Sequence, residues 1–162
     1  MSYHLSDELL LAECRVDTKR AGGPGGQHVN RTASAVRLVH EETGVTVQCQ
    51  DHRERLRNQR DALRAMRLAL ALVVRGISQM TWMDPYRSGR QMRAGAQAQE
   101  YHLLVGCAVD ALERCQGRLA EAAADVSLSS SQLVKLLTAD KSVHAAINAL
   151  RLRHGHDVIK SR

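Results

Sequence analysis

The chain has 162 residues, a length suited to one medium-sized domain or to a small domain with an appended module. Aromatic residues make up 2% and phenylalanine is absent, so a core must rely on Leu, Val, Ala and Met. The formal net charge is +6, and from Lys19 to Arg67 ten basic residues stand against five acidic ones, which favours a phosphate-backbone partner for that part of the chain. The longest apolar run, Leu68 to Val74, is too short to span a membrane, and the first residues lack the basic segment of an export signal.

The cysteines carry no signature of a metal site or a redox motif. None of the four stands in Cys-x-x-Cys spacing: Cys14, Cys49, Cys107 and Cys115. Reduced thiols in a cytoplasmic protein are the simplest interpretation.

The first third of the chain predicts a short helix and a small sheet. Ser6 followed by two acidic residues is a typical helix start, so a helix is expected from Leu9 to Glu13. Alternating apolar residues predict strands over 15–19, 35–40 and 45–50, the last two joined by a Glu-Thr-Gly turn into an antiparallel hairpin. The positions expected to face the core are Val16, Val36, Leu38, Val45, Val47 and Cys49.

One long helix is expected to cover this sheet. Its apolar side, expected to face the core, holds Leu56, Leu63 and Leu70 at intervals of seven, together with Met66 and Val73. Arginines crowd the other faces, either as a solvated helix surface or as contacts to nucleic acid. They are Arg53, Arg57, Arg60, Arg64 and Arg67.

The second half predicts a connector and then more helices. Residues 76–95 mix Trp, Pro, Tyr and Gly with arginines, and this basic stripe is either a second RNA contact or a soluble linker. Helices are expected over 97–115 and 119–125. Ser129 or Ser130 is expected to cap a third, and Asp140 a fourth. Gly155 is expected to end that last helix, in preference to a metal-binding role for its two flanking histidines.

A glycine-rich segment, Gly-Pro-Gly-Gly-Gln at residues 23–27, joins the first strand to the second. Glycine permits positive φ and close approach of the backbone to a ligand, whereas Pro24 fixes its own φ. No Lys-Ser/Thr pair follows and the third glycine of a dinucleotide motif is missing, so neither of those phosphate-binding loops fits. Taken alone, such a stretch can also be a flexible turn.

The segment contains no metal-ligand set and no activated nucleophile. Backbone N–H groups and the Gln27 amide can still position a water and stabilise an oxyanion, provided that another molecule builds the rest of the site. Glu41, Glu42 and Asp51 are alternative general bases, although exposed turn carboxylates are the simpler interpretation of all three.

The motifs around the segment occur in an ordered series: Gly-Gly-Gln (25–27), His-Val-Asn (28–30), Ser-Ala-Val-Arg (34–37), Thr-Gly (43–44) and Gln-Cys-Gln (48–50), then Arg53, Asn58 and Ala62-Leu63. From about residue 15 to residue 70 the chain resembles the catalytic domain of class I peptide chain release factors. The resemblance implies that the loop enters the ribosomal peptidyl transferase centre and promotes attack of water on the peptidyl-tRNA ester. Gly25, Gly26 and Gln27 would then be catalytic: the backbone N–H of Gln27 would act in catalysis, and its side chain would admit water and exclude other nucleophiles. No cofactor and no metal are implied.

The same resemblance makes large-subunit rRNA and peptidyl-tRNA the expected partners. A further expected partner is a glutamine N5-methyltransferase acting on Gln27, as in many relatives. The chain departs from the family at Arg53-Glu54-Arg55, where Arg-Ser-Gln is common, and this affects how the helix start supports the loop and meets RNA. The residues expected to contact RNA are Lys19, Arg20, His28, Asn30, Arg31, Arg53, Arg57, Arg60 and Arg64.

We therefore expect an α+β fold, with a small antiparallel sheet and a long covering helix followed by an all-α module. The expected divisions are a release-factor-like domain (1–76), a basic connector (77–96) and a helical module (97–162). About twenty residues precede the loop, too few for the codon-reading domain of stop-codon release factors, and residues 151–162 are only moderately basic. The expected function is codon-independent, ribosome-dependent hydrolysis of the peptidyl-tRNA ester in the cytoplasm.

Two other functional classes stay open. The chain could be a non-catalytic RNA- or ribosome-binding protein that keeps the same scaffold. Residues 119–137 also faintly resemble a helix-turn-helix, which would suit a DNA-binding regulator. Residues 97–160 hold seven basic and seven acidic residues, however, and a neutral bundle is a poor nucleic-acid binder.

Overall fold

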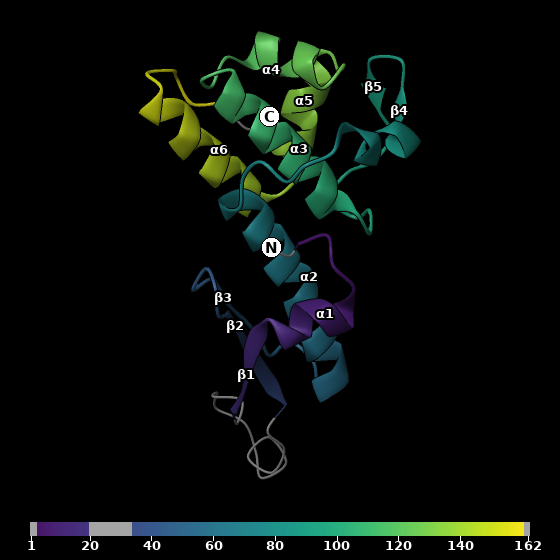
Figure 1. The fold of residues 1–162 in the computed structure, drawn as a ribbon, viewed down its shortest axis with the longest axis vertical. Helices are drawn as coiled ribbons and strands as arrows, with labels where there is room; N and C mark the ends of the chain where they lie inside the picture. Colours follow the sequence, from purple (N-terminus) through teal and green to yellow (C-terminus); the bar gives the residue numbers. More distant parts are fainter. Residues whose placement is uncertain (1–2, 20–33, 161–162) are drawn as a thin grey trace. The chain divides into compact units, whose positions relative to one another are not determined.

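The computed structural model describes residues 3–19 and 34–160 and divides into two compact units, Met1–Leu70 and Ala71–Arg162 (Figure 1). The first unit holds a small sheet, a short helix and most of a long one, and the second is mainly helical. The expected α+β fold class is confirmed.

The sheet of the first unit has the order β1-β2-β3, with both pairs antiparallel. Its strands are β1 (Cys14–Lys19), β2 (Ala35–His40) and β3 (Thr46–Cys49). The register places Val16 opposite Leu38 and Leu38 opposite Val47, which confirms the predicted strands and hairpin. Gly44 has φ +71° in the turn between β2 and β3, a conformation that glycine adopts without strain.

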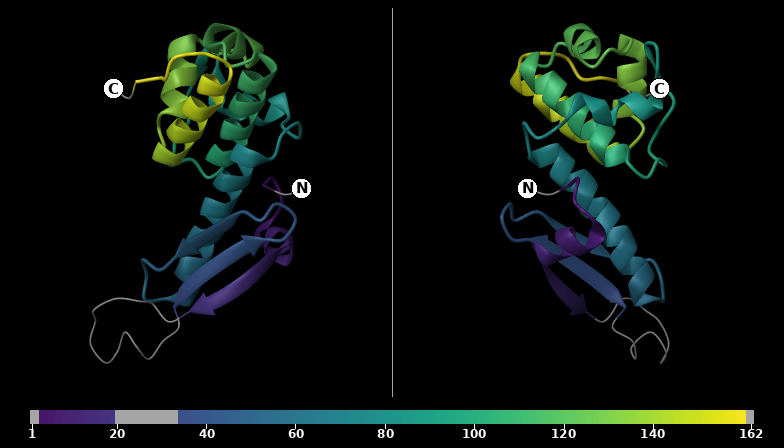
Figure 2. Two further views of the ribbon diagram at one scale, coloured as in Figure 1. Left: turned by 90° about the vertical axis from the view of Figure 1, so that its left-hand side faces the viewer. Right: turned by 45° about the vertical axis from the view of Figure 1, so that its right-hand side comes forward.

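Two helices accompany the sheet: α1 (Asp7–Ala12) before it, and α2 (Arg55–Val73) after it. Ser6 is the N-cap of α1, and its hydroxyl accepts from the Leu9 N–H at 3.4 Å, so the predicted helix start is confirmed. Figure 2 shows α2 lying across one face of the sheet. Val36 and Leu38 of β2 and Leu63 and Met66 of α2 are buried and supply much of this core.

The buried face of α2 differs from the predicted one at both ends. Leu56 is 70% exposed and Val73 is 55% exposed, so the prediction that they face the core is wrong. The seven-residue repeat does place them on the side of Leu63 and Met66, but they lie in the first and last turns of the helix. The residues of this region that are buried are Asn58, Ala62, Leu63, Met66, Leu70, Ala71 and Val74.

The second unit packs four helices, α3 (Tyr101–Arg114), α4 (Leu119–Asp125), α5 (Ser130–Leu137) and α6 (Lys141–Arg153). Ser129 caps α5 and Asp140 caps α6, as predicted. Gly155 follows α6 with φ +76°, as expected of a C-terminal glycine. Aliphatic side chains fill the core of this unit, among them Leu104, Leu112, Leu128, Leu133, Leu137 and Ile147.

The segment expected to be a connector is part of the second unit. It forms two short 3₁₀ turns, η1 (Met80–Trp82) and η2 (Asp84–Tyr86), and a hairpin of β4 (Arg87–Ser88) and β5 (Gln91–Met92). Arg87 donates to the Val126 carbonyl at 3.2 Å, and Arg90 donates to the Leu128 carbonyl at 3.3 Å. Both arginines thus bind the protein's own backbone, and the interpretation of residues 77–96 as a basic connector stays a prediction. Whether residues 1–76 and 97–162 act as separate functional modules stays a prediction.

Candidate functional site

The glycine-rich segment is bounded by paired strand ends. Lys19, the last residue of β1, lies opposite Ala35, the first residue of β2. Residues 20–33 lie outside the described residues, and with them the predicted site residues Arg20, Gly25, Gly26, Gln27, His28, Asn30 and Arg31. The structure therefore describes the two strand ends that residues 20–33 connect, and the residues packed around them.

Asn58 is a buried polar residue that bonds three segments close to these strand ends. Its side chain is fully buried, and its Nδ2 donates to the Ser34 carbonyl and to the His52 carbonyl, both at 2.8 Å. Its Oδ1 accepts from the His52 N–H at 2.9 Å and from the Cys49 thiol at 3.6 Å. One amide thus links the residue before β2, the end of β3 and the turn that leads into α2. The sequence marked Asn58 only as part of a motif and gave no indication of these partners.

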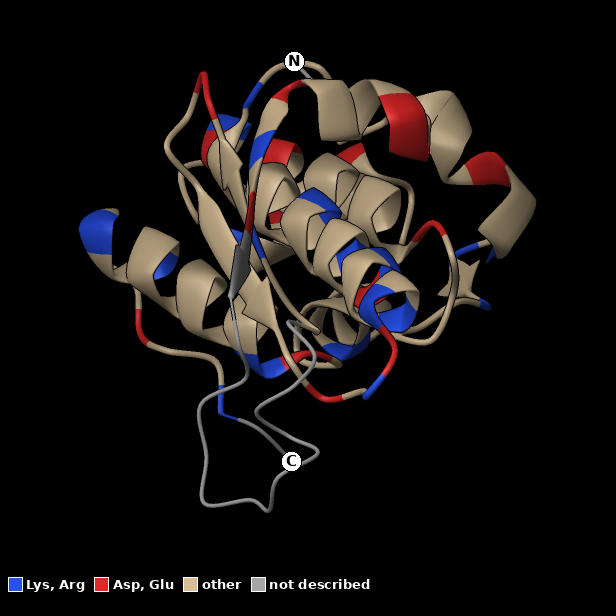
Figure 3. Ribbon diagram, turned by 90° about the horizontal axis from the view of Figure 1, so that it is seen from below, with Lys and Arg blue, Asp and Glu red and all other residues tan. Residues whose placement is uncertain are grey.

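The predicted RNA-contacting arginines of the long helix share an outer face. Arg53, Arg57, Arg60 and Arg64 are exposed, and their spacing of four, three and four residues places those within the helix on one side of α2. Figure 3 marks the Lys and Arg positions in blue. Arg57 pairs with Glu54 at 2.9 Å, an exposed pair that contributes little and leaves the guanidinium accessible to another anion.

Arg67 differs from the other arginines of this run. Its guanidinium is mostly buried, 2.6 Å from the Asp7 carboxylate, and it donates to the Leu5 carbonyl at 2.7 Å. Arg67 therefore ties the segment before α1 to α2 and does not belong to the outer face.

The alternative general bases are separated by the geometry of the sheet. Glu41 and Glu42 lie in the turn after β2, at the end of that strand opposite to Ser34. Six residues of strand span roughly 20 Å, so these carboxylates are far from the point where the segment joins the sheet. Asp51 lies at the nearer end and is exposed, with its carboxylate 3.8 Å from the Cys49 thiol.

Cys14 and Cys107 are not set up as nucleophiles. Burial raises the pKa of the Cys14 thiol. Burial, together with the nearby Asp110 carboxylate, raises the pKa of Cys107 to about 11. Both groups are therefore protonated at neutral pH, whereas an activated cysteine needs a lowered pKa.

The described residues fall short of the requirements of a metal site and of a membrane-spanning helix. Within residues 3–19 and 34–160, no His, Cys, Asp and Glu side chains gather closely enough to hold a metal ion. No helix in the described part of the chain is both long and apolar enough to cross a membrane.

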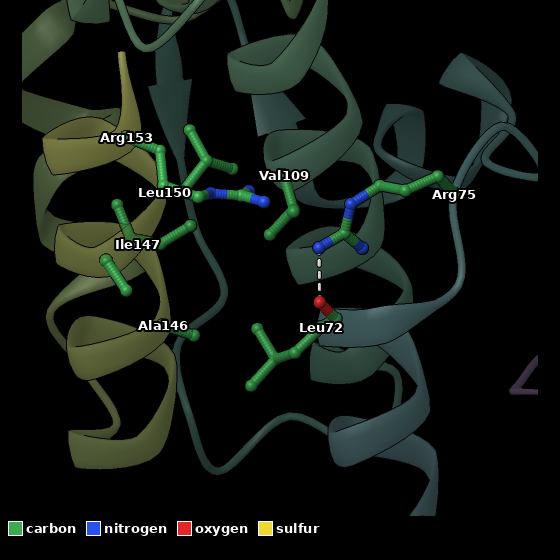
Figure 4. A pocket seen from close by; sticks show the side chains of 8 residues that line it. Leu72, Arg75, Val109, Ala146, Ile147, Leu150 and Arg153 are labelled. Atoms are coloured by element: carbon green, nitrogen blue, oxygen red, sulfur yellow. Dashed lines mark hydrogen bonds between the residues drawn. The ribbon is translucent and has the colours of Figure 1, made fainter. Parts of the chain in front are cut away.

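A hollow of about 210 Å³ in the second unit is lined mainly by aliphatic side chains (Figure 4). Arg75 at its edge donates to three carbonyls at the end of α2, those of Ala71, Leu72 and Val74.

Comparison with known proteins identifies the family of the chain. A family profile described as the RF-1 domain matches residues 6–101, which is more than half of the sequence. The chain belongs to the RF-1 domain family. The match begins before α1 and ends at the start of α3, so the RF-1 domain match is longer than the resemblance over residues 15–70.

Individual relatives of this RF-1 domain protein are peptide chain release factors. Mitochondrial peptide chain release factor 1 of Bos taurus is 45% identical over 89 residues, which cover 54% of this chain and 19% of the relative. Peptide chain release factor 2 of Aromatoleum aromaticum is 51% identical over 59 residues, covering 36% of this chain and 16% of the relative. Mitochondrial peptide chain release factor 1 of Mus musculus is 59% identical over 58 residues, covering 36% and 13%. The chain thus spans less than a fifth of the length of these relatives.

Proposed function

We propose that the chain hydrolyses the ester of peptidyl-tRNA in the ribosomal peptidyl transferase centre, and that it does so without reading a codon. The observation that carries the proposal is the RF-1 domain match over residues 6–101, which contains Gly25-Gly26-Gln27 between the paired strand ends Lys19 and Ala35. The relatives' names as release factors support the same class of reaction.

In the proposed chemistry, the ribosome forms most of the active site and the chain contributes the loop that contains Gly25, Gly26 and Gln27. Gly25 and Gly26 let the backbone approach the tRNA end, and the Gln27 N–H stabilises the oxyanion that forms as water attacks the ester carbonyl. The Gln27 side chain selects water over larger nucleophiles, and its N5-methylation by a methyltransferase is part of the proposal. No protein carboxylate is needed as a base in this proposal; Glu41 and Glu42 lie at the end of β2 opposite to Ser34, whereas Asp51 lies at the nearer end.

The basic residues of the first unit are proposed to hold the loop on RNA. Positive charge between Lys19 and Arg67 exceeds negative charge twofold, and the outer face of α2 presents three exposed arginines, with Arg53 exposed just before the helix. Contacts of arginine with phosphate give affinity without sequence specificity. The residues assigned to these contacts are Lys19, Arg20, His28, Asn30, Arg31, Arg53, Arg57, Arg60 and Arg64.

Codon independence is the finer part of the proposal. Residues 97–160 of the second unit are neutral overall, whereas residues 71–96 of the same unit hold four arginines against one aspartate. The neutral helices suit docking on protein or on the ribosome better than reading a nucleic-acid sequence. The same neutrality argues against the DNA-binding alternative.

The deciding experiment measures release of peptide from ribosomes that carry peptidyl-tRNA with no codon, a sense codon or a stop codon in the A site. Wild-type protein is expected to release peptide from all three complexes. Gly26→Ala and Gln27→Ala should each lower the rate on the order of 100- to 1000-fold, as for loss of an oxyanion donor, while ribosome binding persists.

Three results would contradict the proposal. Release by Gly26→Ala at close to the wild-type rate would exclude catalysis by the loop. Release confined to the stop-codon complex would exclude codon independence. Ribosome binding by a wild-type protein that releases no peptide would establish the non-catalytic alternative.

A further inference from the structure

Asn58 occupies a position in the first unit that packing alone does not explain. It lies on the buried face of α2, where the neighbouring buried residues Ala62, Leu63 and Met66 are apolar. A buried amide is costly unless its hydrogen bonds are satisfied, and here both N–H groups and the carbonyl oxygen have partners. The amide therefore specifies an arrangement of backbone that an apolar side chain of similar size would leave unspecified.

The partners of Asn58 are main-chain groups of two segments far apart in the sequence. The Ser34 carbonyl belongs to the residue immediately before β2, and Ser34 is itself buried. The His52 N–H and carbonyl belong to the turn that precedes α2, one residue before Arg53. The side chain of a single residue thus joins the point where the glycine-rich segment returns to the sheet to the point where the arginine-bearing helix begins.

We propose that Asn58 is a positioning residue for peptide release: through Ser34 and His52 it fixes the return of the glycine-rich segment relative to the arginine face of α2. This inference rests on the proposed function. If those arginines hold RNA, the bonds of Asn58 set where the chain returns to the sheet at Ser34 relative to that RNA. Misplacement of a catalytic group by about 1 Å can cost on the order of 100-fold in rate.

The test compares Asn58→Asp, which acts at the Ser34 end of β2, with a matched variant at the other end of β2. Asn58→Asp keeps the size and an acceptor but loses the two donors and sets a carboxylate against two carbonyls. His40 is also fully buried, and its ring nitrogens contact Thr43 Oγ1 at 2.9 Å and Glu13 Oε2 at 3.1 Å, at the end of β2 opposite to Ser34. His40→Gln therefore perturbs a buried polar cluster of the same unit without touching the return of the segment.

The positioning role predicts a fall in kcat without a change in ribosome binding. At a temperature where both variants are folded, Asn58→Asp should lower kcat on the order of 100-fold and leave the half-saturating ribosome concentration unchanged. His40→Gln should leave both quantities at wild-type values. If Asn58→Asp does not fold, Asn58→Gln, which keeps the amide but displaces it by one methylene, should lower kcat in the same direction by a smaller factor.

Amide hydrogen exchange separates failure of this inference from failure of the proposed function. Asn58→Asp should accelerate exchange at Ala35 and Val36 but not at Val39 and His40, and His40→Gln should show the reverse. Equal losses of kcat in the two variants, or unchanged exchange at Ala35 and Val36 in Asn58→Asp, would overturn the positioning role. A wild-type protein that releases no peptide would overturn the proposed function, whereas the exchange pattern would still establish whether Asn58 orders the start of β2.

Discussion

Asp140 shows how much a single residue contributes at the start of a helix. Its Oδ1 accepts from the Ser142 N–H at 2.8 Å, the Ser142 hydroxyl at 2.5 Å and the Val143 N–H at 3.1 Å. Asp140→Ala should lower the unfolding free energy by about 1 kcal/mol, because the first N–H groups of α6 lose their acceptor. Trp82, the sole tryptophan, lies in the same unit, so its fluorescence during denaturation follows this unfolding.

The matched control for this change is Asp157→Ala. Asp157 is an exposed aspartate of the same unit that caps no helix, so its loss should change stability little. Equal effects of the two substitutions would show that net charge, and not the cap, accounts for the loss.

The same carboxylate makes stability depend on pH. Partial burial works to raise the pKa of Asp140, but the hydrogen bonds from Ser142 and Val143 outweigh it and hold the pKa below the usual value near 3.8. A carboxyl group whose pKa falls on folding stabilises the protein above its unfolded pKa, and this contribution is lost as the pH falls through the folded pKa. Asp140→Asn should therefore lose less stability than wild type between about pH 4 and more acidic values. Identical pH profiles of the two proteins would contradict this assignment.

Single residues also show where sequence reasoning succeeds. Ser6, Ser129 and Asp140 were predictable as caps because a cap bonds groups two or three residues along the chain. Asn58 and Arg67 were not predictable in their roles, since they bond backbone 24 and 62 residues away. A sequence pattern records which side chains are polar but not which distant carbonyl they meet.

At the level of elements, the long helix was predicted correctly in its existence and position, and incorrectly at both ends of its buried face. Its position over the sheet followed from the apolar repeat and is confirmed, whereas its buried face was misjudged at Leu56 and Val73. A repeat indicates which side of a helix is apolar. How many turns of that side are buried depends on how far the sheet and the rest of the unit extend along the helix, which the repeat does not record. The amide of Asn58 takes the buried place in the first turn because of its partners, and hydrophobicity alone would not select it.

The arginine face of α2 makes a prediction about salt dependence. Replacing Arg57, Arg60 and Arg64 together by glutamine should weaken ribosome binding and reduce the slope of log affinity against log salt by about one for each lost phosphate contact. The melting temperature should change little, because all three side chains are exposed. Binding measured over a range of KCl concentrations tests the slope.

A control of equal charge separates local contact from overall attraction. Arg114, Arg118 and Arg153 are exposed arginines of the second unit, each paired with an acidic side chain as Arg57 is. Their joint replacement by glutamine removes the same charge from a different unit. If both triple variants lowered the slope equally, the arginines of α2 would belong to a solvated surface and not to a specific RNA contact.

For the whole molecule, the sequence identified the fold class and the family, because the strands, the hairpin and the motif order are local patterns. It did not assign residues 77–96 to the second unit. That assignment depends on bonds such as Arg87 to Val126 and Arg90 to Leu128, which join positions 39 and 38 residues apart. Met83 and Met92 of the same segment are buried, although the composition of the segment is that of a linker.

The division into two units predicts how fragments of the chain behave. Residues 1–76 should fold alone, because buried side chains of the sheet and α2 form a core inside the first unit. Residues 1–96 should be less soluble, since removal of the helices exposes Met83 and Met92 and leaves the hairpin without the Val126 and Leu128 carbonyls. Circular dichroism and sedimentation of the two fragments measure the difference.

The 1–76 fragment also tests what the second unit does for activity. If the helical unit mainly docks the protein, the fragment should release little peptide at low concentration and recover part of the activity at high concentration, because docking raises the effective concentration of the loop. Its kcat at saturation should then approach that of the full chain, whereas its half-saturating concentration should be higher. A soluble, folded fragment whose activity stays absent at every concentration would assign the second unit a part in catalysis itself. An unfolded fragment would show that the first unit depends on residues beyond position 76 for its stability, and the separation into an independent catalytic module and a docking module would be wrong.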